Sequence, residues 1–249
     1  MKPVARPVMH TVFISDLHLE DARPEATEIL RQFLRGPARD AEALYVLGDL
    51  FEFWIGDDVL TDTAQDVATE LSALRTRGVR CYFVHGNRDF LLGPDYARLS
   101  GLELLPTASV VDLYAMPTLL LHGDTLCTDD LEYQAFRRKV RDPSFQQMFL
   151  GMPPAQRLAM ARSARDASKA HTGSAAMEIM DVNSNAVELA FAEHQVLRMI
   201  HGHTHRPAVH RHALAGGGSA ARVVLADWYK DGSYLRVDLH GQQHVPLGG

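Results

Sequence analysis

Cysteine is scarce in this chain, which excludes a disulfide-stabilised architecture. Two of the 249 residues are cysteines, Cys81 and Cys127, and their spacing fits neither a disulfide framework nor a paired metal-binding motif. We therefore expect reduced thiols and a cytoplasmic protein. Cys81 stands in an apolar run and is expected to be an ordinary core residue.

Long apolar segments and an excess of positive charge are also missing. No run reaches the roughly 18 apolar residues that a membrane-spanning helix needs, and no signal-peptide pattern opens the sequence. Any membrane contact is therefore expected to be peripheral. The formal net charge of −6 argues against a nucleic-acid partner. The Gly-x-Ser-x-Gly pattern of serine hydrolases is absent, so no serine nucleophile is expected.

What the chain contains is typical of a globular α/β protein. Its hydrophobic content of 46% is enough for one domain with a substantial core, or for one domain with an insertion. Over the first 84 residues, apolar runs alternate with amphipathic segments, which predicts a layered core of β-α-β-α-β order. The predicted strands are 8–15, 43–47, 79–84, 108–114, 117–122, 196–201, 222–227 and 233–239, with helices from about Pro24 and Thr63.

Five short polar groups come directly after apolar runs. They are Asp16-Leu17-His18, Gly48-Asp49, Gly86-Asn87-Arg88-Asp89, His122-Gly123-Asp124 and Gly202-His203-Thr204-His205. Because open α/β sheets collect their binding sites at strand ends, we expect these groups to meet in space. Together they supply seven good metal ligands, which are Asp16, His18, Asp49, Asn87, His122, His203 and His205.

The types of these ligands predict a metal-dependent hydrolase. Carboxylate, imidazole and amide oxygen suit manganese, iron, cobalt or zinc. Seven ligands exceed the needs of one tetrahedral ion but fit two ions about 3.5–4 Å apart, which can clamp a phosphate and activate water. Asp49 is the expected bridge, because a carboxylate carries the charge that holds two dications together. Each group alone could be incidental, and His122 alone could be a core histidine; the order of all five is specific.

In this order the five groups resemble the motifs of the calcineurin-like metallophosphoesterases, D-x-H, G-D, G-N-H/R-D/E, H and G-H-x-H. Arg88 stands where many members carry His. Further stretches are similar to the UDP-2,3-diacylglucosamine hydrolases of bacterial lipid A synthesis, and this resemblance spans about residues 10–240. These stretches are 50–58, 86–93, 122–137, 179–183 and 200–208.

The resemblance implies a fold, a reaction and a location. The fold would be α/β, a layered β-sandwich flanked by helices, with a core at 1–127 and 178–249 and a helical lid at 128–177. With two Mn²⁺ ions, the enzyme would cleave the pyrophosphate of UDP-2,3-diacylglucosamine by water attack at the α-phosphorus, giving UMP and 2,3-diacylglucosamine 1-phosphate. The protein would be a cytoplasmic monomer, peripheral on the anionic surface of the inner membrane.

The resemblance also implies residue roles. Asp16, His18, Asp49 and His205 would bind one metal, and Asp49, Asn87, His122 and His203 the other. The catalytic residues would be Asp49, Asn87, Arg88 and His203. Substrate contacts would fall on Asn87, Arg88, Asp130, Ser168, Thr172, Ala175 and His203. Members often carry Asn at position 172 and Lys at position 175; Ala175 cannot hold an anion, and the nearby Lys169 is the base that could replace it. We further expect Asp89 either to orient Asn87 or His203, or to serve as a simple loop cap.

Residues 128–177 interrupt the strand–helix alternation. Asp142-Pro143 is a typical helix start, and Phe145, Met148, Phe149 and Met152 form one apolar stripe. Eight basic and five acidic residues between 128 and 169 give +3, so the remainder of the chain carries −9. Two interpretations stay open: a self-packed insertion with solvated bases, or a lid that offers apolar side chains to acyl chains and bases to phosphates. The position directly after the His122 group favours the lid.

Two other functions stay open as well. A related enzyme could keep the metals and act on another phosphoester, as a protein phosphatase, a cyclic-nucleotide phosphodiesterase or a nuclease does. The charge of −9 outside the insertion argues against a nuclease, which needs a basic groove. A cyclic-nucleotide enzyme has no need of the apolar insertion. A catalytically inactive scaffold would tolerate the loss of ligands, whereas all seven are present here.

Overall fold

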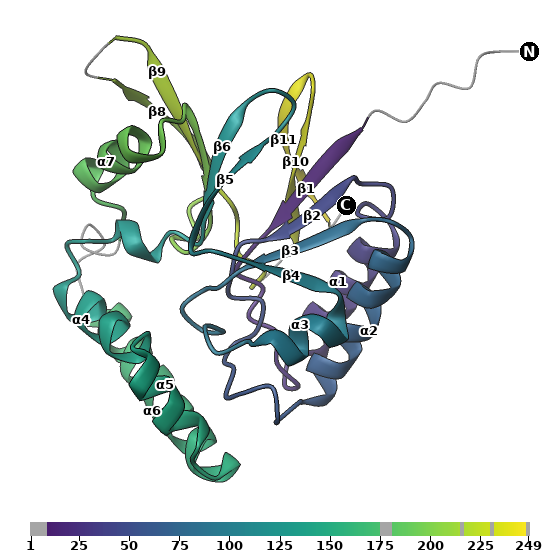
Figure 1. Ribbon diagram of the computed structural model, residues 1–249, viewed down its shortest axis with the longest axis vertical. Helices are drawn as coiled ribbons and strands as arrows, with labels where there is room; N and C mark the ends of the chain where they lie inside the picture. The colour runs from purple at the N-terminus through teal and green to yellow at the C-terminus, as the bar shows by residue number, and fades with distance from the viewer. Residues whose placement is uncertain (1–8, 175–180, 215–216, 230–231, 248–249) are drawn as a thin grey trace, which may run out of the picture.

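The structure, a computed structural model, describes residues 9–174, 181–214, 217–229 and 232–247, with side chains for all of these except 169–174. Two β-sheets lie face to face at its centre, with helices on both outer sides (Figure 1). Within the described ranges, no helix combines the length and the apolar character needed to cross a bilayer.

The first sheet has six strands: β1 (His10–Ile14), β2 (Ala43–Val46), β3 (Arg80–Val84), β4 (Leu102–Leu105), β10 (Ser233–Asp238) and β11 (Gly241–Pro246). Their order is β11-β10-β1-β2-β3-β4. Strands β1 to β4 are parallel, and β10 and β11 extend the sheet in antiparallel fashion. The parallel strands are connected by α1 (Pro24–Arg35), α2 (Asp62–Thr76) and α3 (Pro94–Ser100). The carboxyl ends of β1, β2 and β3 therefore meet at one edge.

The second sheet has five strands: β5 (Ala108–Asp112), β6 (Pro117–Leu121), β7 (Arg198–His201), β8 (Ala208–Ala213) and β9 (Ser219–Val224). Their order is β5-β6-β7-β9-β8, with β6, β7 and β9 parallel and both edge strands antiparallel to their neighbours. Helix α7 (Ser184–His194) covers the outer face, where its Val187 and Phe191 pack with Leu119 and Met199.

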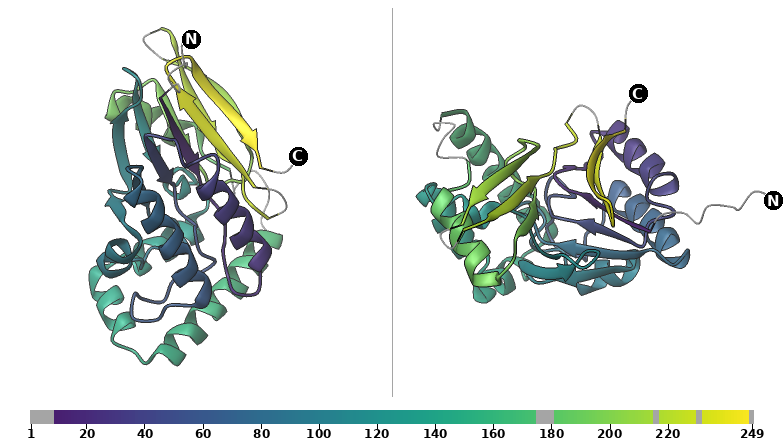
Figure 2. Two further views of the ribbon diagram at one scale, coloured as in Figure 1. Left: turned by 90° about the vertical axis from the view of Figure 1, so that its right-hand side faces the viewer. Right: turned by 90° about the horizontal axis from the view of Figure 1, so that it is seen from above.

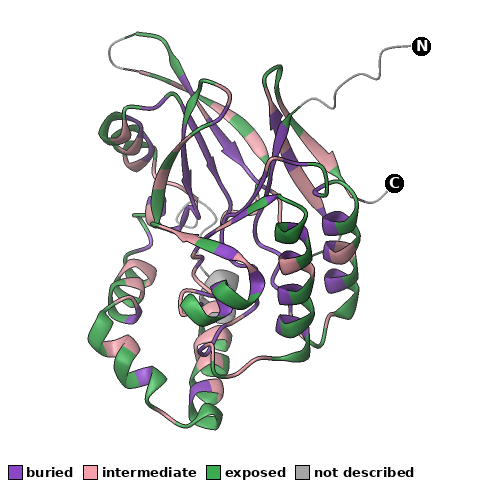
Figure 3. Cartoon of the chain, turned by 45° about the vertical axis from the view of Figure 1, so that its right-hand side comes forward, coloured by how far each residue is buried: buried purple, intermediate pink, exposed green. Residues whose placement is uncertain are grey.

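Side chains of the first sheet alternate between two cores, because successive residues of a strand point to opposite faces. In β1, Phe13 enters the core between the sheets together with Leu120 and Ile200 of the second sheet. Its neighbours Val12 and Ile14 face the helices instead. The central strands β1, β2, β6 and β7 are accordingly buried almost continuously, whereas the edge strands are partly exposed (Figure 3). This layering confirms the predicted β-sandwich flanked by helices.

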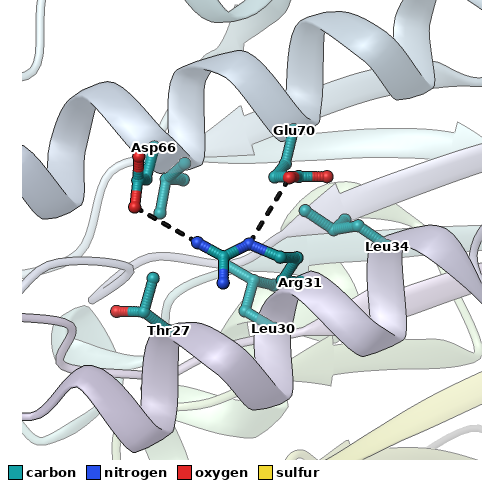
Figure 4. Close-up of a pocket in the computed structure, with 7 residues that line it drawn as sticks. Thr27, Leu30, Arg31, Leu34, Asp66 and Glu70 are labelled. Carbon is teal, nitrogen blue, oxygen red and sulfur yellow. Dashed lines mark hydrogen bonds and ion pairs between the residues drawn. The ribbon is translucent and has the colours of Figure 1, made fainter.

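Helices α1 and α2 are joined by charge as well as by apolar packing. Arg31 of α1 reaches Asp66 and Glu70 of α2, with Nη2 3.2 Å from Oδ2 of Asp66 and Nε 3.5 Å from Oε1 of Glu70 (Figure 4). These residues line a shallow depression between the helices together with Thr27 and Leu30. Exposed ion pairs contribute about 0–1 kcal/mol each, so the apolar core beneath holds the helix pair.

Between β6 and α7 the chain forms a short 3₁₀ turn, η1 (Asp124–Leu126), and three helices, α4 (Leu131–Val140), α5 (Pro143–Leu150) and α6 (Pro154–Ser174). The three helices lie together at the end of the molecule toward which β1, β2 and β3 run (Figures 1 and 2). Asp142 caps α5 by accepting the backbone N–H groups of Ser144 and Phe145, as its sequence predicts.

Most core strands lie where the sequence predicts them, and the differences have local causes. The strand predicted at 222–227 lies earlier in the chain, at Ser219–Val224. Beyond it, the backbone N–H of Trp228 donates to the carbonyl oxygen of Asp16 at 3.1 Å. The sequence analysis missed β4, β8, β11, α3 and α7. Strands β8 and β11 are polar edge strands with alternating exposure, so they lack the apolar run that identifies a buried strand.

A Phe13→Ala substitution tests the core between the sheets. The side chain is fully buried and stacks on Tyr45 at a centroid distance of 5.1 Å. We expect the free energy of unfolding in urea to fall by about 3–5 kcal/mol, since the cavity cannot collapse between two sheets. The control is Leu239→Ala, at a side chain that is 62% exposed, where the change should stay within about 0.5 kcal/mol. Equal losses in both variants would contradict the layered core.

Candidate active site

The seven predicted ligand residues lie together where parallel strands of both sheets end. Asp16 and His18 follow β1, Asp49 follows β2, Asn87 follows β3, His122 follows β6, and His203 and His205 follow β7. Five of them have left-handed backbone, with φ of 57° at Asp16, 51° at His18, 51° at Asp49, 68° at His203 and 53° at His205. Such a conformation costs a residue with a side chain about 1–3 kcal/mol, and it is found mainly where function requires it.

One half of the site is built around Asp16. Its Oδ1 accepts from Nε2 of His205 at 3.2 Å, and its Oδ2 accepts from the backbone N–H of His203 at 2.9 Å. On the other side, Nε2 of His18 lies 3.8 Å from Oδ2 of Asp49. Ligand atoms of Asp16, His18 and His205 all lie within 4.8 Å of one another, so these three side chains could share one cation.

The other half is built around the amide of Asn87. Its Oδ1 lies 2.9 Å from Nε2 of His122 and 2.9 Å from Nδ1 of His203. Nε2 of His122 is also 3.7 Å from Oδ1 of Asp49. Nδ1 of His122 donates to the carbonyl oxygen of Leu47 at 2.8 Å, which leaves Nε2 as the nitrogen that faces the site. Asp49 thus approaches histidines of both halves.

Glycines permit these close approaches. A Cβ on Gly86 would collide with the carboxylate of Asp49, and a Cβ on Gly202 would collide with the carboxylate of Asp16. Gly48 serves both purposes, since a Cβ there would collide with Gly86 and with Nδ1 of His122, and its φ of +87° turns the backbone sharply after β2. The glycines within the sequence motifs therefore provide space for the ligands as well as the turn.

Burial and mutual attraction set the charges of the site. Burial acts to raise the pKa of Asp16, but the hydrogen bond and the positive charge of His205 outweigh it and hold that pKa well below its usual range. Burial acts to lower the pKa of His122, and the carboxylates of Asp49 and Asp16 reverse this and raise it. Burial and the nearby His122 lower the pKa of His203 to about 4, so its ring is neutral at pH 7, as metal ligation requires.

The donor set fits divalent cations. Both ring nitrogens of His18 are buried and form no hydrogen bond with the described residues, although Nδ1 lies 3.1 Å from Oε2 of Glu52 in an ion-pair contact. An unsatisfied polar atom such as Nε2 is costly. Nδ1 of His122 carries a proton, because it donates to the carbonyl oxygen of Leu47. In a neutral His122, Nε2 is therefore unprotonated. It then faces the amide oxygen of Asn87 at 2.9 Å, and both atoms are acceptors. Bound cations would satisfy such acceptors without extra protons.

Asp89 has a different partner set from the one predicted. It is fully buried, and its carboxylate accepts the backbone N–H groups of Gly86 at 3.0 Å, Leu50 at 2.7 Å and Asp49 at 3.3 Å. The prediction that Asp89 orients Asn87 or His203 is wrong, because these backbone donors surround its oxygens. Asp89 therefore ties the turn after β2 to the turn after β3. Burial and the neighbouring charge of Asp49 raise its pKa to about 6.

Asp124 is a structural residue of the site that the sequence analysis missed. Its buried carboxylate accepts from the hydroxyl of Tyr133 at 2.8 Å and from Nε of Arg137 at 2.6 Å, both on α4. The ring of Tyr133 in turn lies 5.9 Å from that of His203. Asp124 thus attaches the first helix of the insertion beside a ligand. Its place in the His122 group was the available signal.

The predicted substrate contacts are only partly described. Nη2 of Arg88 donates to Oγ of Ser168 at 3.1 Å, which joins the turn after β3 to α6. Asp130 caps α4 by accepting the backbone N–H of Tyr133 at 2.9 Å. The side chains of Thr172 and Lys169, and all of Ala175, lie outside the described part of the structure.

The bases of the insertion are not simply solvated. Four of them bind groups of the core. Arg137 binds the carboxylate of Asp124, and Arg141 binds the carbonyl oxygen of Gly86. Arg157 binds both Asp58 and the carbonyl oxygen of Ile55, and Arg165 binds Glu52. The predicted apolar stripe is only partly covered, since Phe149 is buried whereas Met148 is 51% exposed. The insertion therefore docks on the strand-end loops and leaves apolar surface open.

Two further side chains lie against the ligand His18 and carry no motif signal. Oε2 of Glu52 lies 3.1 Å from Nδ1 of His18. The ring of Tyr229, from the segment between β9 and β10, stacks on the imidazole with centroids 5.0 Å apart and planes at 9°. Glu52 stands within an apolar segment and Tyr229 far along the chain, so only the fold reveals their proximity to His18.

Two stacked sheets with carboxylate, amide and imidazole ligands at their strand ends define a metal-dependent phosphoesterase. A model of the calcineurin-like phosphoesterases matches residues 9–207, a range that contains all seven ligand positions. The chain belongs to the calcineurin-like phosphoesterase family. Membership implies divalent metal ions, in agreement with the groups of ligand atoms described above.

Curated relatives cover almost the whole chain. A UDP-2,3-diacylglucosamine hydrolase of Stenotrophomonas maltophilia (strain K279a) is 53% identical over 240 residues, which cover 94% of this chain and 96% of the relative. A protein of the same name from Xanthomonas campestris pv. campestris (strain ATCC 33913) is 52% identical over 240 residues, 94% of this chain and 97% of its own. Among solved structures, a phosphoesterase from E. coli aligns with 96% of this chain and 94% of its own, at 17% identity and a TM-score of 0.46.

Gly202→Ala is expected to damage the half of the site around Asp16. The added methyl group meets the Asp16 carboxylate and Oγ of Ser15, so the ligand must move. We expect the affinity for divalent metal, measured by titration calorimetry, to fall about 10–100-fold. Gly151→Ala is the matched control, because its Cβ would lie 3.4 Å from its nearest neighbour, an ordinary contact. Wild-type metal affinity in Gly202→Ala would contradict the role assigned to this glycine.

The acid sensitivity of the metal-free protein should depend on His201. This fully buried ring donates from Nδ1 to the carbonyl oxygen of Gly202 at 2.8 Å, and Nη1 of Arg222 lies 3.1 Å from its Nε2. Burial and the charge of Arg222 lower its pKa from 6.5 to about 3.

The native ring stays neutral while the unfolded chain binds a proton, so the contribution of His201 to stability is fully present above about pH 6.5 and is lost as the pH falls toward 3. We expect the free energy of unfolding in urea, measured with chelator present, to fall less steeply from pH 7 to pH 4.5 in His201→Gln than in the wild type. Parallel slopes would show that another group causes the acid sensitivity.

Proposed function

We propose that this enzyme hydrolyses UDP-2,3-diacylglucosamine by water attack at the α-phosphorus, giving UMP and 2,3-diacylglucosamine 1-phosphate in lipid A synthesis. The observation that carries this proposal is the identity of 53% and 52% to hydrolases of that name over 94% of the chain. The site geometry supports it independently, because a centre rich in metal ligands lies directly beside an insertion with apolar and basic side chains.

Two Mn²⁺ ions are the proposed cofactors. Asp16, His18, Asp49 and His205 would hold one, and Asp49, Asn87, His122 and His203 the other. When bound, the ions would supply an activated water at neutral pH and positive charge against the phosphate oxygens. A ligand set of carboxylate, amide oxygen and imidazole without thiolate suits manganese.

The residues of the chain would orient the pyrophosphate and balance its charge. Arg88 is proposed to pair with two phosphoryl oxygens, since its planar guanidinium matches them. Its Nη2 is held by Ser168, and its Nε is buried without a hydrogen-bond partner in the described ranges. The neutral ring of His203 fixes the amide of Asn87 through the 2.9 Å contact at Nδ1. With Asp49, these are the proposed catalytic residues.

We propose residues 128–177 as a lid over the core formed by 1–127 and 178–249. A small depression beside Asn87 is lined by apolar and aromatic side chains and by two bases: Phe90, Tyr133, Phe136, Val140, Arg137 and Arg141. An acyl chain attached close to the scissile pyrophosphate could lie along such a surface. The remaining proposed substrate contacts, Asp130, Thr172 and Ala175, belong to the same insertion.

The insertion also supports peripheral attachment to the inner membrane of a cytoplasmic monomer. Its exposed apolar side chains include Leu131 at 75%, Met148 at 51% and Met160 at 40%. Exposed bases lie on the same helices: Arg138, Lys139 and Arg162. A base close to an anionic bilayer contributes about 1 kcal/mol, so this combination favours a surface where the acylated substrate resides.

The decisive experiment is product analysis with purified protein, Mn²⁺ and UDP-2,3-diacylglucosamine. We expect mass spectrometry to detect UMP and the diacylglucosamine phosphate, and we expect chelator to abolish both. Asp49→Ala should remain folded and inactive, because it removes the ligand that approaches both halves of the site. Asp66→Ala is the control, since Asp66 lies on α2 and pairs with Arg31.

The possible failures are informative in different ways. Hydrolysis of a simple phosphodiester with Mn²⁺, without cleavage of the lipid substrate, would leave the metal centre standing and remove both the acyl-sugar function and the lid. Near wild-type turnover in Asp49→Ala would instead contradict the two-metal assignment.

A further inference from the structure

The backbone register of two neighbouring turns brings Glu52 beside His18. The parallel pairing of β1 and β2 continues beyond the strands: the N–H of His18 donates to the carbonyl of Asp49 at 3.0 Å, and the N–H of Leu19 to that of Leu50 at 2.9 Å. The N–H of Glu52 then donates to the carbonyl of Leu19 at 3.0 Å. This register places the Glu52 side chain at the ligand.

The two carboxylate oxygens of Glu52 have different partners. Oε2 lies 3.1 Å from Nδ1 of His18, and Oε1 accepts from Nε of Arg165 on α6. The side chain of Glu52 is 9% exposed and that of His18 is 3% exposed, so water competes little for either contact. A single buried carboxylate therefore joins a ligand to the helical insertion.

The orientation of the His18 ring follows from these contacts. With Nδ1 facing Glu52, Nε2 faces the site, where it lies 3.8 Å from Oδ2 of Asp49. Tyr229 stacks on the imidazole, and the guanidinium of Arg23 lies 5.3 Å from the centre of the tyrosine ring. Glu52 thus lies on the Nδ1 side of the His18 ring, and Tyr229 lies against its face.

We propose that Glu52 is a positioning residue that orients His18 for metal binding and, through Arg165, couples metal affinity to the docking of α6. The inference rests on the proposed metal site. A carboxylate that accepts from the second nitrogen of a ligating histidine fixes its tautomer and increases its basicity, and loss of such a partner typically weakens metal binding about 10–100-fold. Because the same carboxylate binds Arg165, helix docking and ligand orientation share one group.

The chain contains a matched contact for comparison. Arg157, also on α6, donates from Nη1 to Oδ1 of Asp58 at 2.7 Å and to the carbonyl oxygen of Ile55 at 2.6 Å. This ion pair attaches the same helix to the same loop of the core without touching a proposed ligand. Loss of the Asp58 charge should therefore weaken helix docking and leave His18 in place.

The experiment compares Glu52→Gln, Arg165→Gln and Asp58→Asn in the full chain. Chelator-treated protein is titrated with Mn²⁺ in a calorimeter, and thermal unfolding of the metal-free protein is recorded in parallel. Gln keeps the size of Glu52 and removes its charge, so we expect about 10–100-fold weaker Mn²⁺ binding. Arg165→Gln should cause a smaller loss, because Glu52 keeps its contact with His18, and Asp58→Asn should bind Mn²⁺ as the wild type does.

Several outcomes would overturn the inference. If Glu52→Gln lowers the unfolding temperature but binds Mn²⁺ normally, Glu52 is merely structural. If Asp58→Asn loses as much affinity as Glu52→Gln, helix docking and not ring orientation is responsible. Wild-type affinity in Arg165→Gln would remove the link to α6. A wild-type protein that binds Mn²⁺ but leaves UDP-2,3-diacylglucosamine intact would contradict the proposed function alone. The Mn²⁺ affinities of the variants would still test the role of Glu52.

Discussion

The convergence of buried polar side chains at strand ends is the constraint on which the rest of this structure depends. Asp16, Asp49 and His122 place charges or hydrogen-bonding atoms in a region that water barely reaches, and such groups are costly unless partners are fixed around them. The chain adopts left-handed backbone at five of the seven predicted ligand residues to achieve it. The local cost is tolerable because two apolar cores hold the strands rigidly beneath.

The face-to-face packing of the sheets is as important to the site as the ligands themselves. Asp16 and Asp49 come from the first sheet, whereas His122 and His203 come from the second. The backbone N–H of His203 donates to Oδ2 of Asp16 at 2.9 Å, a bond across the two sheets. A shift of one sheet against the other would separate these atoms, so the core around Phe13 controls the geometry of the site.

Much of the fold, and the meeting of the seven predicted ligand residues in space, could be predicted from the sequence, because both follow from local patterns. A glycine-flanked polar group after an apolar run marks a strand end, and strand ends of parallel sheets meet. The contacts of Asp89 with backbone, and of Glu52 with His18, could not be predicted in this way. These contacts depend on how neighbouring loops lie in space. The sequence alone does not distinguish a buried carboxylate that binds backbone groups from one that contacts a predicted metal ligand. Polar edge strands such as β8 were not predicted for a different reason: they contain no apolar run that would identify a buried strand.

The helical insertion is attached to the same loops that carry the ligands, and this explains its basic charge. Three of its bases bind groups within or next to the polar motifs. Arg137 binds Asp124, Arg141 binds the carbonyl oxygen of Gly86, and Arg165 binds Glu52. Guanidinium groups suit this task, because each offers several donors to carboxylates and carbonyls at once. An apolar interface would have covered the stripe on α5, whereas polar attachment leaves Met148 exposed. The predicted ligands therefore rest on the ends of the strands, and exposed apolar side chains such as Met148 rest on the helices beside them.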